Sequence, residues 1–182
     1  MEIKYLKSSE ISKEVMNGLV EVFFSNRYEY EPNLYHRLNV SEEEEKKDYI
    51  LKEKIRTDLE QRVKIRFGFF VVYDGNQIVG YNNHYLNEHN GNYKKLEIGT
   101  TVINPTHHGR GIGQEIYKKI EEMHREDFKI KEILRATWST NERQKYLYDK
   151  NGYKIIEVIK NHYGVEGIHK LTFSKKVNQT EE

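Results

Sequence analysis

The decisive stretch of the sequence is VINPTHHGRGIG, which runs from Val102 to Gly113. A strand pattern ends at Asn104-Pro105, three closely spaced glycines follow, and a helical pattern begins at once. Glycines let backbone N–H groups converge on an anion without interference from Cβ atoms. The start of the helix adds unpaired N–H groups and partial positive charge, and Arg110 adds a full charge. The stretch therefore predicts a cradle for a phosphate or pyrophosphate group.

Two common nucleotide-binding motifs fit this loop poorly. A P-loop requires Lys followed by Ser or Thr after its last glycine, whereas Gln114-Glu115 follows Gly113. A Rossmann fingerprint requires Gly-x-Gly-x-x-Gly, and the third glycine here comes one residue early. On these residues alone, a glycine-rich connection that binds no ligand also stays open.

The sequence on either side of the loop predicts alternating strands and helices. Expected strands are Ile3–Leu6, Phe67–Tyr73, Gln77–Leu86, Leu96–Ile103, Glu132–Thr137, Tyr153–Ile159 and Ile168–Phe173. Expected helices follow a cap at Ser8 or Ser9, a capping box at Ser41 and Glu44, the glycine loop, and a cap at Thr140 or Asn141. Expected turns and loops are Asp74-Gly75-Asn76, the polar segment Asn87–Asn92, and a helix stop at Asn151-Gly152. Together they predict an α+β fold: a mixed, mostly antiparallel sheet with helices on both faces.

Length and composition limit the class of protein. The chain has 182 residues and 2 prolines, and we expect one domain over residues 1–177 with a short polar tail at 178–182. Its 30 basic and 29 acidic residues leave a net charge of +1, which argues against a general nucleic-acid binder. It shows neither an apolar run that could span a membrane nor a secretory pattern, so we expect a cytoplasmic protein without a membrane partner. Because Cys is absent and no His spacing suits a metal, we expect no metal ion.

Two motifs in the same order point to a known family. The first is His108 to Gly113 after Ile103-Asn104-Pro105, and the second is NERQ at 141–144 followed by LYDKNGY at 147–153. They resemble the Gln/Arg-x-x-Gly-x-Gly/Ala loop and the Asn-x-x-Ala…Leu-Tyr-x-x-x-Gly-Phe signature of the GNAT superfamily of N-acetyltransferases, which use acetyl-coenzyme A (acetyl-CoA). The resemblance covers about Phe67 to Phe173. It implies the GNAT fold, in which the strand ending at Ile103 splays from the strand at Glu132–Thr137 and leaves a cofactor cleft.

The resemblance also implies which residues bind acetyl-CoA. The backbone of Thr101, Val102 and Ile103 would bind the pantetheine arm like an added strand. The pyrophosphate would lie over His108, Gly109, Arg110, Gly111, Ile112, Gly113 and Gln114. Asn141 would hold the pantetheine arm, and Tyr148 would lie near the thioester sulfur. Two residues depart from the family pattern, because His108 replaces Gln or Arg and Gln144 replaces a small Ala.

Two residues are the expected acid and base. Tyr148 is the expected acid for the leaving thiolate, because a phenol with a pKa of about 10 still carries its proton near neutral pH. Glu97 matches the general base of the histone-acetylating branch of the superfamily, and the alternative is a solvated charge on a strand. His107 and His108 are further candidates for the proton route or for binding phosphate.

The resemblance implies transfer of an acetyl group from acetyl-CoA to a primary amine by direct attack in a ternary complex. The alternative is a non-catalytic acyl-CoA-binding sensor, which needs the cradle but neither acid nor base. The acceptor, a small molecule or a peptide, stays open, as do the length of the acyl group and assembly into a homodimer. Candidates for the wall of an acceptor pocket are Tyr28, Tyr30, Tyr35 and the segment Tyr81–Tyr93.

Overall fold

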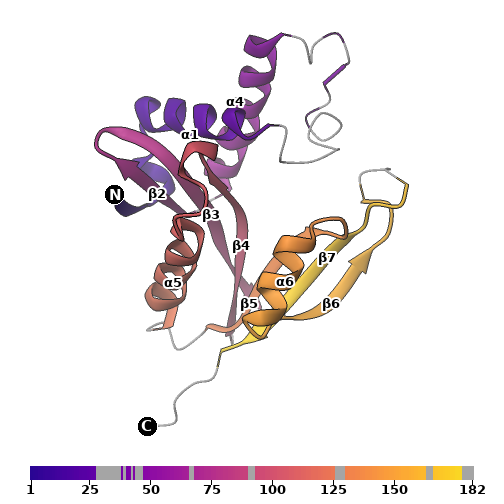
Figure 1. Ribbon diagram of the computed structural model, residues 1–182. Helices are drawn as coiled ribbons and strands as arrows, with labels where there is room; N and C mark the ends of the chain where they lie inside the picture. Colours follow the sequence, from indigo (N-terminus) through magenta and orange to yellow (C-terminus); the bar gives the residue numbers. More distant parts are fainter. Residues whose placement is uncertain are drawn as a thin grey trace. The chain divides into compact units, whose positions relative to one another are not determined.

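A computed structural model describes residues 1–27, 38, 40–41, 43, 47–65, 68–89, 93–125, 130–162 and 166–177 (Figure 1). They form two compact units, each built from two stretches of the chain. The first unit contains Met1–Asn83 and Thr100–Ile120, and the second contains His84–Gly99 and Glu121–Glu182. The polar tail expected at 178–182 lies outside the described residues, and the single domain stays a prediction.

The strands of the first unit begin with an antiparallel pair. Strand β1 (Glu2–Leu6) pairs with β2 (Gly68–Asp74) from Glu2–Tyr73 to Leu6–Phe69. A tight turn joins β2 to β3 (Gln77–His89), and Gly75 occupies the left-handed region there with φ +59°, as the hairpin motif predicts. The last part of β4 (Tyr93–Ile103) completes this part of the sheet, next to β3.

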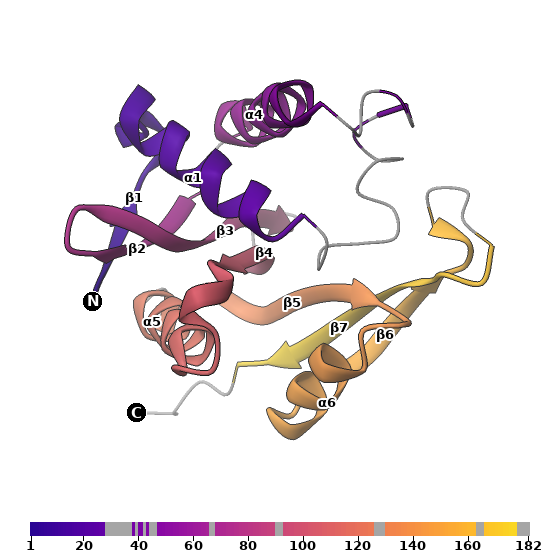
Figure 2. The same ribbon diagram turned by 45° about the horizontal axis from the view of Figure 1, so that its top comes forward.

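Helices cover both faces of these strands. Helices α1 (Lys13–Ser25) and α4 (Asp48–Lys64) lie side by side on one face, and α5 (Ile112–Arg125) lies on the other (Figure 2). Each buries an apolar stripe at helical spacing. The buried stripes comprise Leu19, Val20 and Phe23 of α1, Leu51, Ile55 and Leu59 of α4, and Ile112, Ile116 and Ile120 of α5.

Two expected helix starts are wrong. Ser12 caps α1 by accepting a hydrogen bond from the Val15 N–H at 3.3 Å, whereas Ser8–Glu10 forms a separate 3₁₀ turn. Helix α4 begins at Asp48 after Lys47, which makes no side-chain cap, so Ser41 does not start it. Glu44, the other half of the expected capping box, lies outside the described residues. Both errors arise because apolar spacing shows which turns face the core but not where a helix begins.

The second unit contains a parallel strand pair among antiparallel ones. Strand β4 runs parallel to β5 (Ile130–Trp138), from Lys94–Ile130 to Ile98–Arg135. Strand β5 pairs antiparallel with β7 (Lys170–Lys176) along its length to Trp138, and β7 pairs antiparallel with β6 (Lys154–Ile159). The predicted α+β fold with a mixed, mostly antiparallel sheet is therefore confirmed. The parallel pairing ends at Ile98 although both strands continue. The predicted cofactor cleft stays a prediction.

Smaller differences concern loops and helix ends. Strand β3 extends to His89, so the polar loop expected at Asn87–Asn92 is wrong over its first residues, and its last residues lie outside the described part. Helix α6 (Glu142–Lys150) begins after Asn141 and ends before Gly152, which has φ +82°, as predicted. Within the described residues, no helix combines the length and the apolar content that a membrane span requires.

Candidate functional site

The entry to the glycine loop is fixed by local hydrogen bonds in the first unit. The Asn104 side-chain oxygen accepts from the Thr106 N–H at 3.1 Å and from the Thr106 hydroxyl at 2.8 Å. Pro105 begins a short 3₁₀ turn over Pro105–His107, and the Asn104 N–H donates to the Val79 carbonyl of β3 at 2.8 Å. The Asn-Pro pair therefore anchors the loop to the sheet immediately before the glycines.

The three glycines leave open space in front of the backbone. Gly109 and Gly111 both have φ +76°, a conformation that strains other residues. A Cβ atom built on Gly109, Gly111 or Gly113 would meet no described atom within 4 Å. The Gly111 carbonyl accepts from the Glu115 N–H at 3.1 Å, so the helix begins there and its next three N–H groups have no intrahelical partner. The result is an open site lined by N–H groups, which suits an anion.

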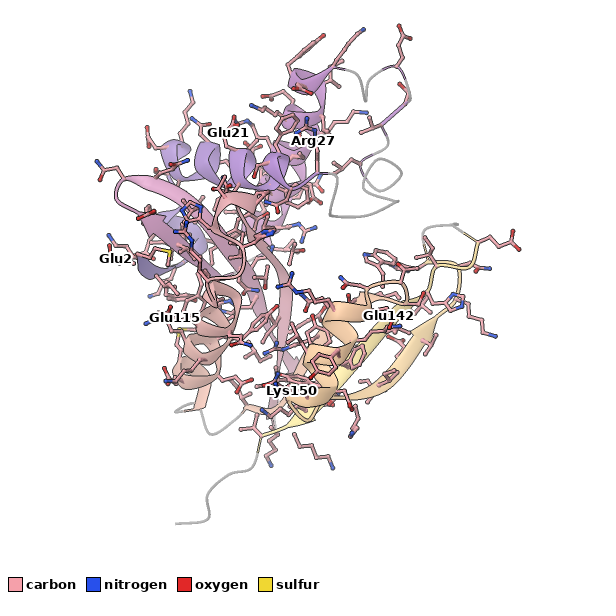
Figure 3. All side chains as sticks on the ribbon, viewed as in Figure 1. Glu2, Glu21, Arg27, Glu115, Glu142 and Lys150 are labelled. Carbon is pink, nitrogen blue, oxygen red and sulfur yellow. The ribbon has the colours of Figure 1, made fainter. Side chains whose placement is uncertain are left out.

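Charged side chains border this loop. Arg110 is exposed and donates to the Thr106 carbonyl at 3.3 Å, which folds its cation back over the loop. Glu115 places a negatively charged carboxylate in the first turn of α5 (Figure 3). The positive charge of the site comes from the Arg110 guanidinium and from the partial charge of the helix N-terminus.

Both histidines of the loop make structural contacts. His107 Nε2 lies 3.2 Å from a carboxylate oxygen of Asp74, and its Nδ1 lies 2.8 Å from the Thr106 hydroxyl. This links the loop to the turn after β2. His108 Nε2 lies 2.8 Å from the Ile103 carbonyl. Because a carbonyl can only accept, Nε2 of His108 carries the hydrogen. Roles for either residue in phosphate binding or proton transfer stay predictions.

At its C-terminal end, β4 has one edge that faces β3 and one edge that is directed away from β3. The Thr100 N–H donates to the Asn83 side-chain oxygen at 3.1 Å, and the Asn104 N–H points to the Val79 carbonyl of β3. N–H groups alternate in direction along a strand, so those of Thr101 and Ile103 face the opposite edge. This is the edge at which an added strand, such as the predicted pantetheine arm, would pair. The Ile103 carbonyl on that edge already accepts from His108.

Sequence reasoning missed a buried polar cluster behind this edge. Asn82 donates to the Thr101 hydroxyl oxygen at 2.9 Å, and the Thr101 hydroxyl donates to that of Tyr117 at 3.1 Å. Asn82 and Asn83 are both fully buried. The available signal was the pair of asparagines inside a strand pattern, where such residues are unfavourable without a specific partner. The cluster fixes β4 at the residues expected to bind the pantetheine arm.

In the second unit, Asn141 works as a helix cap. Its side-chain oxygen accepts from the Gln144 N–H at 3.1 Å, and α6 carries Glu142 and Lys150 at its two ends (Figure 3). The predicted contact of Asn141 with the pantetheine arm stays a prediction. Gln144, where the family has a small residue, buries its side-chain oxygen with no hydrogen-bond partner in the described part of the chain.

Tyr148 lies in the core of the second unit. Only 6% of the residue is exposed, and its ring packs edge-on against Phe173 with 5.1 Å between centroids. Tyr153 lies 5.9 Å away, and the buried Arg135 guanidinium lies 5.5 Å from the Tyr148 ring. Burial raises the pKa of Tyr153, whose hydroxyl donates to Glu121 at 3.2 Å. The ring of Tyr148 is therefore held rigidly, and its catalytic role stays a prediction.

Glu97 borders a pocket in the second unit. It lies half-buried on β4, opposite Leu134 of β5 in the parallel pair. The pocket measures about 390 Å³, and its wall includes Glu97, Leu134, Ala136, Ile156, Glu157 and Thr172. Glu97 thus faces a hollow of the sheet surface, and its role as a base stays a prediction. Within the described residues, no group of His, Asp and Glu side chains could hold a metal ion.

Comparison with known families identifies the chain. Residues 24–153 match the acetyltransferase (GNAT) family. The chain belongs to this family. The family membership, inferred above from the glycine loop and the Asn141–Tyr153 motif, is confirmed, and with it the classification as an acetyltransferase.

Solved GNAT structures share the fold. The PaiA N-acetyltransferase of Thermoplasma acidophilum, in complex with coenzyme A, is 19% identical with a TM-score of 0.64, covering 97% of this chain and 100% of its own. An Elizabethkingia anophelis GNAT acetyltransferase with acetyl-CoA bound is 19% identical with a TM-score of 0.56, covering 66% and 82%. Naa50 of Arabidopsis thaliana, in complex with the bisubstrate analogue CoA-Ac-MVNAL, is 23% identical with a TM-score of 0.54, covering 60% and 72%. A search of curated proteins found no match. The predicted GNAT fold is confirmed.

Proposed function

We propose that this GNAT acetyltransferase transfers an acetyl group from acetyl-CoA to a primary amine of a small-molecule or peptide acceptor. The observation that carries the proposal is the cradle at Gly109–Gly113, with two left-handed glycines, an open helix N-terminus and Arg110 beside it. A pyrophosphate fits this donor set because its oxygens accept from N–H groups and carry negative charge. The coenzyme A complexes of related folds support the same ligand.

The proposed reaction forms one C–N bond and breaks one C–S bond. The neutral amine attacks the thioester carbonyl, and Glu97 accepts the ammonium proton directly or through water. Tyr148 donates its hydroxyl proton to the leaving thiolate and regains a proton from solvent. The Thr101 and Ile103 N–H groups, on the edge of β4 directed away from β3, are the proposed backbone donors to the developing oxyanion, whereas the Thr100 N–H donates to Asn83. A peptide acceptor draws support from the Naa50 complex with CoA-Ac-MVNAL.

Gly113 offers the sharpest test of the cradle. Its Cβ position is open in the folded chain, so Gly113→Val should fold, while its side chain would occupy the space proposed for the pyrophosphate. We expect calorimetry to show at least about a tenfold loss of coenzyme A affinity, which corresponds to about 1.4 kcal/mol. Lys118→Val, an exposed position of the same helix, is the control and should bind nearly as wild type. Equal affinity in Gly113→Val and wild type would contradict the cradle.

An assay of thiol release separates the enzyme from an acyl-CoA sensor. Wild-type protein is mixed with acetyl-CoA and a panel of diamines, aminoglycosides, amino acids and peptides with free N-termini. We expect release of coenzyme A thiol that depends on one class of amine and produces the acetylated amine in equal amount. Binding of acetyl-CoA with no turnover by any amine would favour the sensor.

A further inference from the structure

The outer strand of the second unit exposes an unusual amount of apolar surface. All six residues of β6, Lys154–Ile159, are exposed. The four aliphatic residues are exposed by 52% at Ile155, 55% at Ile156, 49% at Val158 and 37% at Ile159. Single exposed aliphatic residues are ordinary, but four in one short strand leave apolar surface on both faces of that strand.

Strand β6 is also an edge. Among the described strands it follows β7 at the end of the sheet order, so one row of its backbone N–H and C=O groups is directed away from the sheet. Such an edge is a template for pairing with another strand, and proteins usually blunt it with charges or proline. Here no proline interrupts the strand and only Lys154 and Glu157 are charged, but its register with β7 shifts at a bulge between Ile155 and Glu157, which places Ile155 and Val158 on one face.

We propose that β6 is a homodimer interface, in which β6 pairs antiparallel with β6 of a second copy of this chain about a two-fold axis. In this pairing Ile155 lies opposite Val158 of the partner subunit, and Lys154 lies opposite Ile159 of the partner subunit. The proposal does not depend on the proposed function, because it uses no residue of the cradle and neither the expected acid nor the expected base.

The faces of the strand select this register. Ile155 and Val158 pair with Phe173 and Leu171 of β7, which lie on one face of the sheet, the face that α6 covers through Phe173. Lys154 and Ile159 pair with Ser174 and Lys170 and so lie on the other face. A two-fold axis perpendicular to the sheet keeps each face continuous between copies. The proposed register therefore matches aliphatic side chains across the α6 face of both copies.

Charge complementarity supports the same register. Lys154 and Glu157 lie on one face of β6, since their β7 partners are Ser174 and Thr172. In the proposed pairing, Lys154 of each copy is diagonal to Glu157 of the partner subunit, a spacing within reach of long side chains. A shift by one residue in one direction would place the two Glu157 carboxylates opposite one another, and a shift in the other direction would place Ile155 opposite Glu157 of the partner subunit; both pairings are unfavourable. The net charge of +1 also gives two copies little mutual repulsion.

A second copy covers this edge more completely than a single peptide strand. An added peptide would present a new free edge of its own, whereas two-fold pairing of β6 uses up both edges and closes the assembly. The pocket beside β6 adds apolar surface on the α6 face: it measures about 380 Å³ and is lined by Tyr153, Ile155 and Phe173 together with charged residues of α6. Pairing of the two edges thus brings Ile155 of one copy beside Val158 of the partner subunit next to this pocket.

The absence of cysteine makes the register directly testable by cross-linking. The full-length double variant Ile155→Cys/Val158→Cys places two symmetric thiol pairs across the interface, and mild oxidation should convert most of it to a covalent dimer. Each single variant, which lacks the opposite thiol, is the matched control and should cross-link at least about tenfold more slowly than the double variant. Equal cross-linking of the double and single variants would overturn the register.

Sedimentation velocity over a range of protein concentrations tests the dimer itself. We expect a concentration-dependent dimer, with about a tenfold or greater rise in its dissociation constant for Lys154→Glu or Glu157→Lys and recovery in the double exchange. Ile65→Lys, at a site exposed by 67% on the first unit, should leave the dimer unchanged. Circular dichroism confirms folding of each variant. A wild-type chain that stays monomeric at every concentration overturns the proposal. That result would hold whether the β6 edge is left unpaired or binds a different partner.

Discussion

At the scale of single residues, Tyr148 combines a packed ring with a predicted chemical role. Tyr148→Phe keeps the ring against Phe173 and Tyr153 and removes one hydroxyl, so the fold should change little. If the hydroxyl protonates the thiolate, kcat should fall by about 10²–10⁴ while coenzyme A affinity stays close to wild type. Steady-state kinetics and calorimetry on the same preparation measure both quantities.

Tyr153→Phe is the matched control, because it removes a hydroxyl from the neighbouring ring. That hydroxyl donates to Glu121, so its loss should lower stability by about 1 kcal/mol with little change in kcat. Full activity in Tyr148→Phe would show that the Tyr148 hydroxyl is not the acid and that the residue serves in packing. Equal losses of kcat in both variants would indicate that the ring cluster as a whole, rather than one proton donor, affects turnover.

Glu97→Gln tests the predicted base, because glutamine keeps the shape of the side chain but cannot accept the ammonium proton. The wild-type rate should rise with pH as the acceptor amine loses its proton. The variant should lose most activity at low pH and recover part of it at high pH, where solvent supplies neutral amine. Glu157→Gln removes a carboxylate from the wall of the same pocket and should leave the pH–rate profile nearly unchanged. An unaltered profile in Glu97→Gln would make Glu97 a solvated strand charge.

At the scale of elements, predictions from the sequence were most accurate where a single local effect, such as apolar spacing or turn chemistry, determines the structure. The stripes of α4 and α5 follow from apolar spacing, and the left-handed Gly75 and Gly152 follow from turn chemistry. The start of α1 was wrong because Ser8, Ser9 and Ser12 are all possible caps, and the start of α4 was wrong because no side chain caps it. One strand end was also misplaced, as β3 continues to His89 through residues with the polar composition of a loop.

The same distinction applies to the candidate site. The glycine loop could be predicted because its backbone conformation demands glycine at Gly109 and Gly111. The cluster of Asn82, Asn83 and Tyr117 could not, because it depends on which side chains of β3, β4 and α5 meet across the fold. Local sequence patterns reveal which backbone conformations are required. Contacts between side chains that are distant in sequence can be identified only from the three-dimensional structure.

Glu132 links three strands of the second unit and gives a test of pH dependence. Burial alone would raise its pKa, but hydrogen bonds from Lys95 of β4 and Ser174 of β7 outweigh burial and lower the pKa below its ordinary value of 4.5. The folded chain therefore holds this proton less readily than the unfolded chain, so the stabilisation is complete above that value and is lost as pH falls through the folded pKa.

Glu132→Gln should accordingly melt at a lower temperature than wild type near neutral pH, and the difference should shrink at about pH 4 and below. Thermal unfolding of both proteins across this range measures the effect. Glu142→Gln, which alters a carboxylate with 82% of its side chain exposed, is the control. A difference between wild type and Glu132→Gln that stays constant with pH would show that packing, rather than the ionised carboxylate, carries the contribution.

At the scale of the whole molecule, acetyl-CoA should stabilise the native chain by mass action, because the cradle exists only in the folded state. At a concentration of about 100 times its dissociation constant the ligand adds about 2.7 kcal/mol, or roughly 5–10 °C in melting temperature for a chain of this size. Gly111→Ala should lose most of this shift, because its side chain strains the left-handed backbone of the cradle at φ +76°. Differential scanning fluorimetry with and without acetyl-CoA measures the shift.

Gly75→Ala separates loss of the ligand from loss of stability. Gly75 also has a positive φ and an open Cβ position, but it lies in the turn between β2 and β3. Both alanine variants should melt below wild type without ligand, since each forces a side chain into the left-handed region at a cost of about 1–2 kcal/mol. Only Gly75→Ala should keep the full shift with acetyl-CoA. If the two variants gain equally from acetyl-CoA, the ligand binds without the Gly111 backbone, and the cradle must be sought elsewhere in the chain.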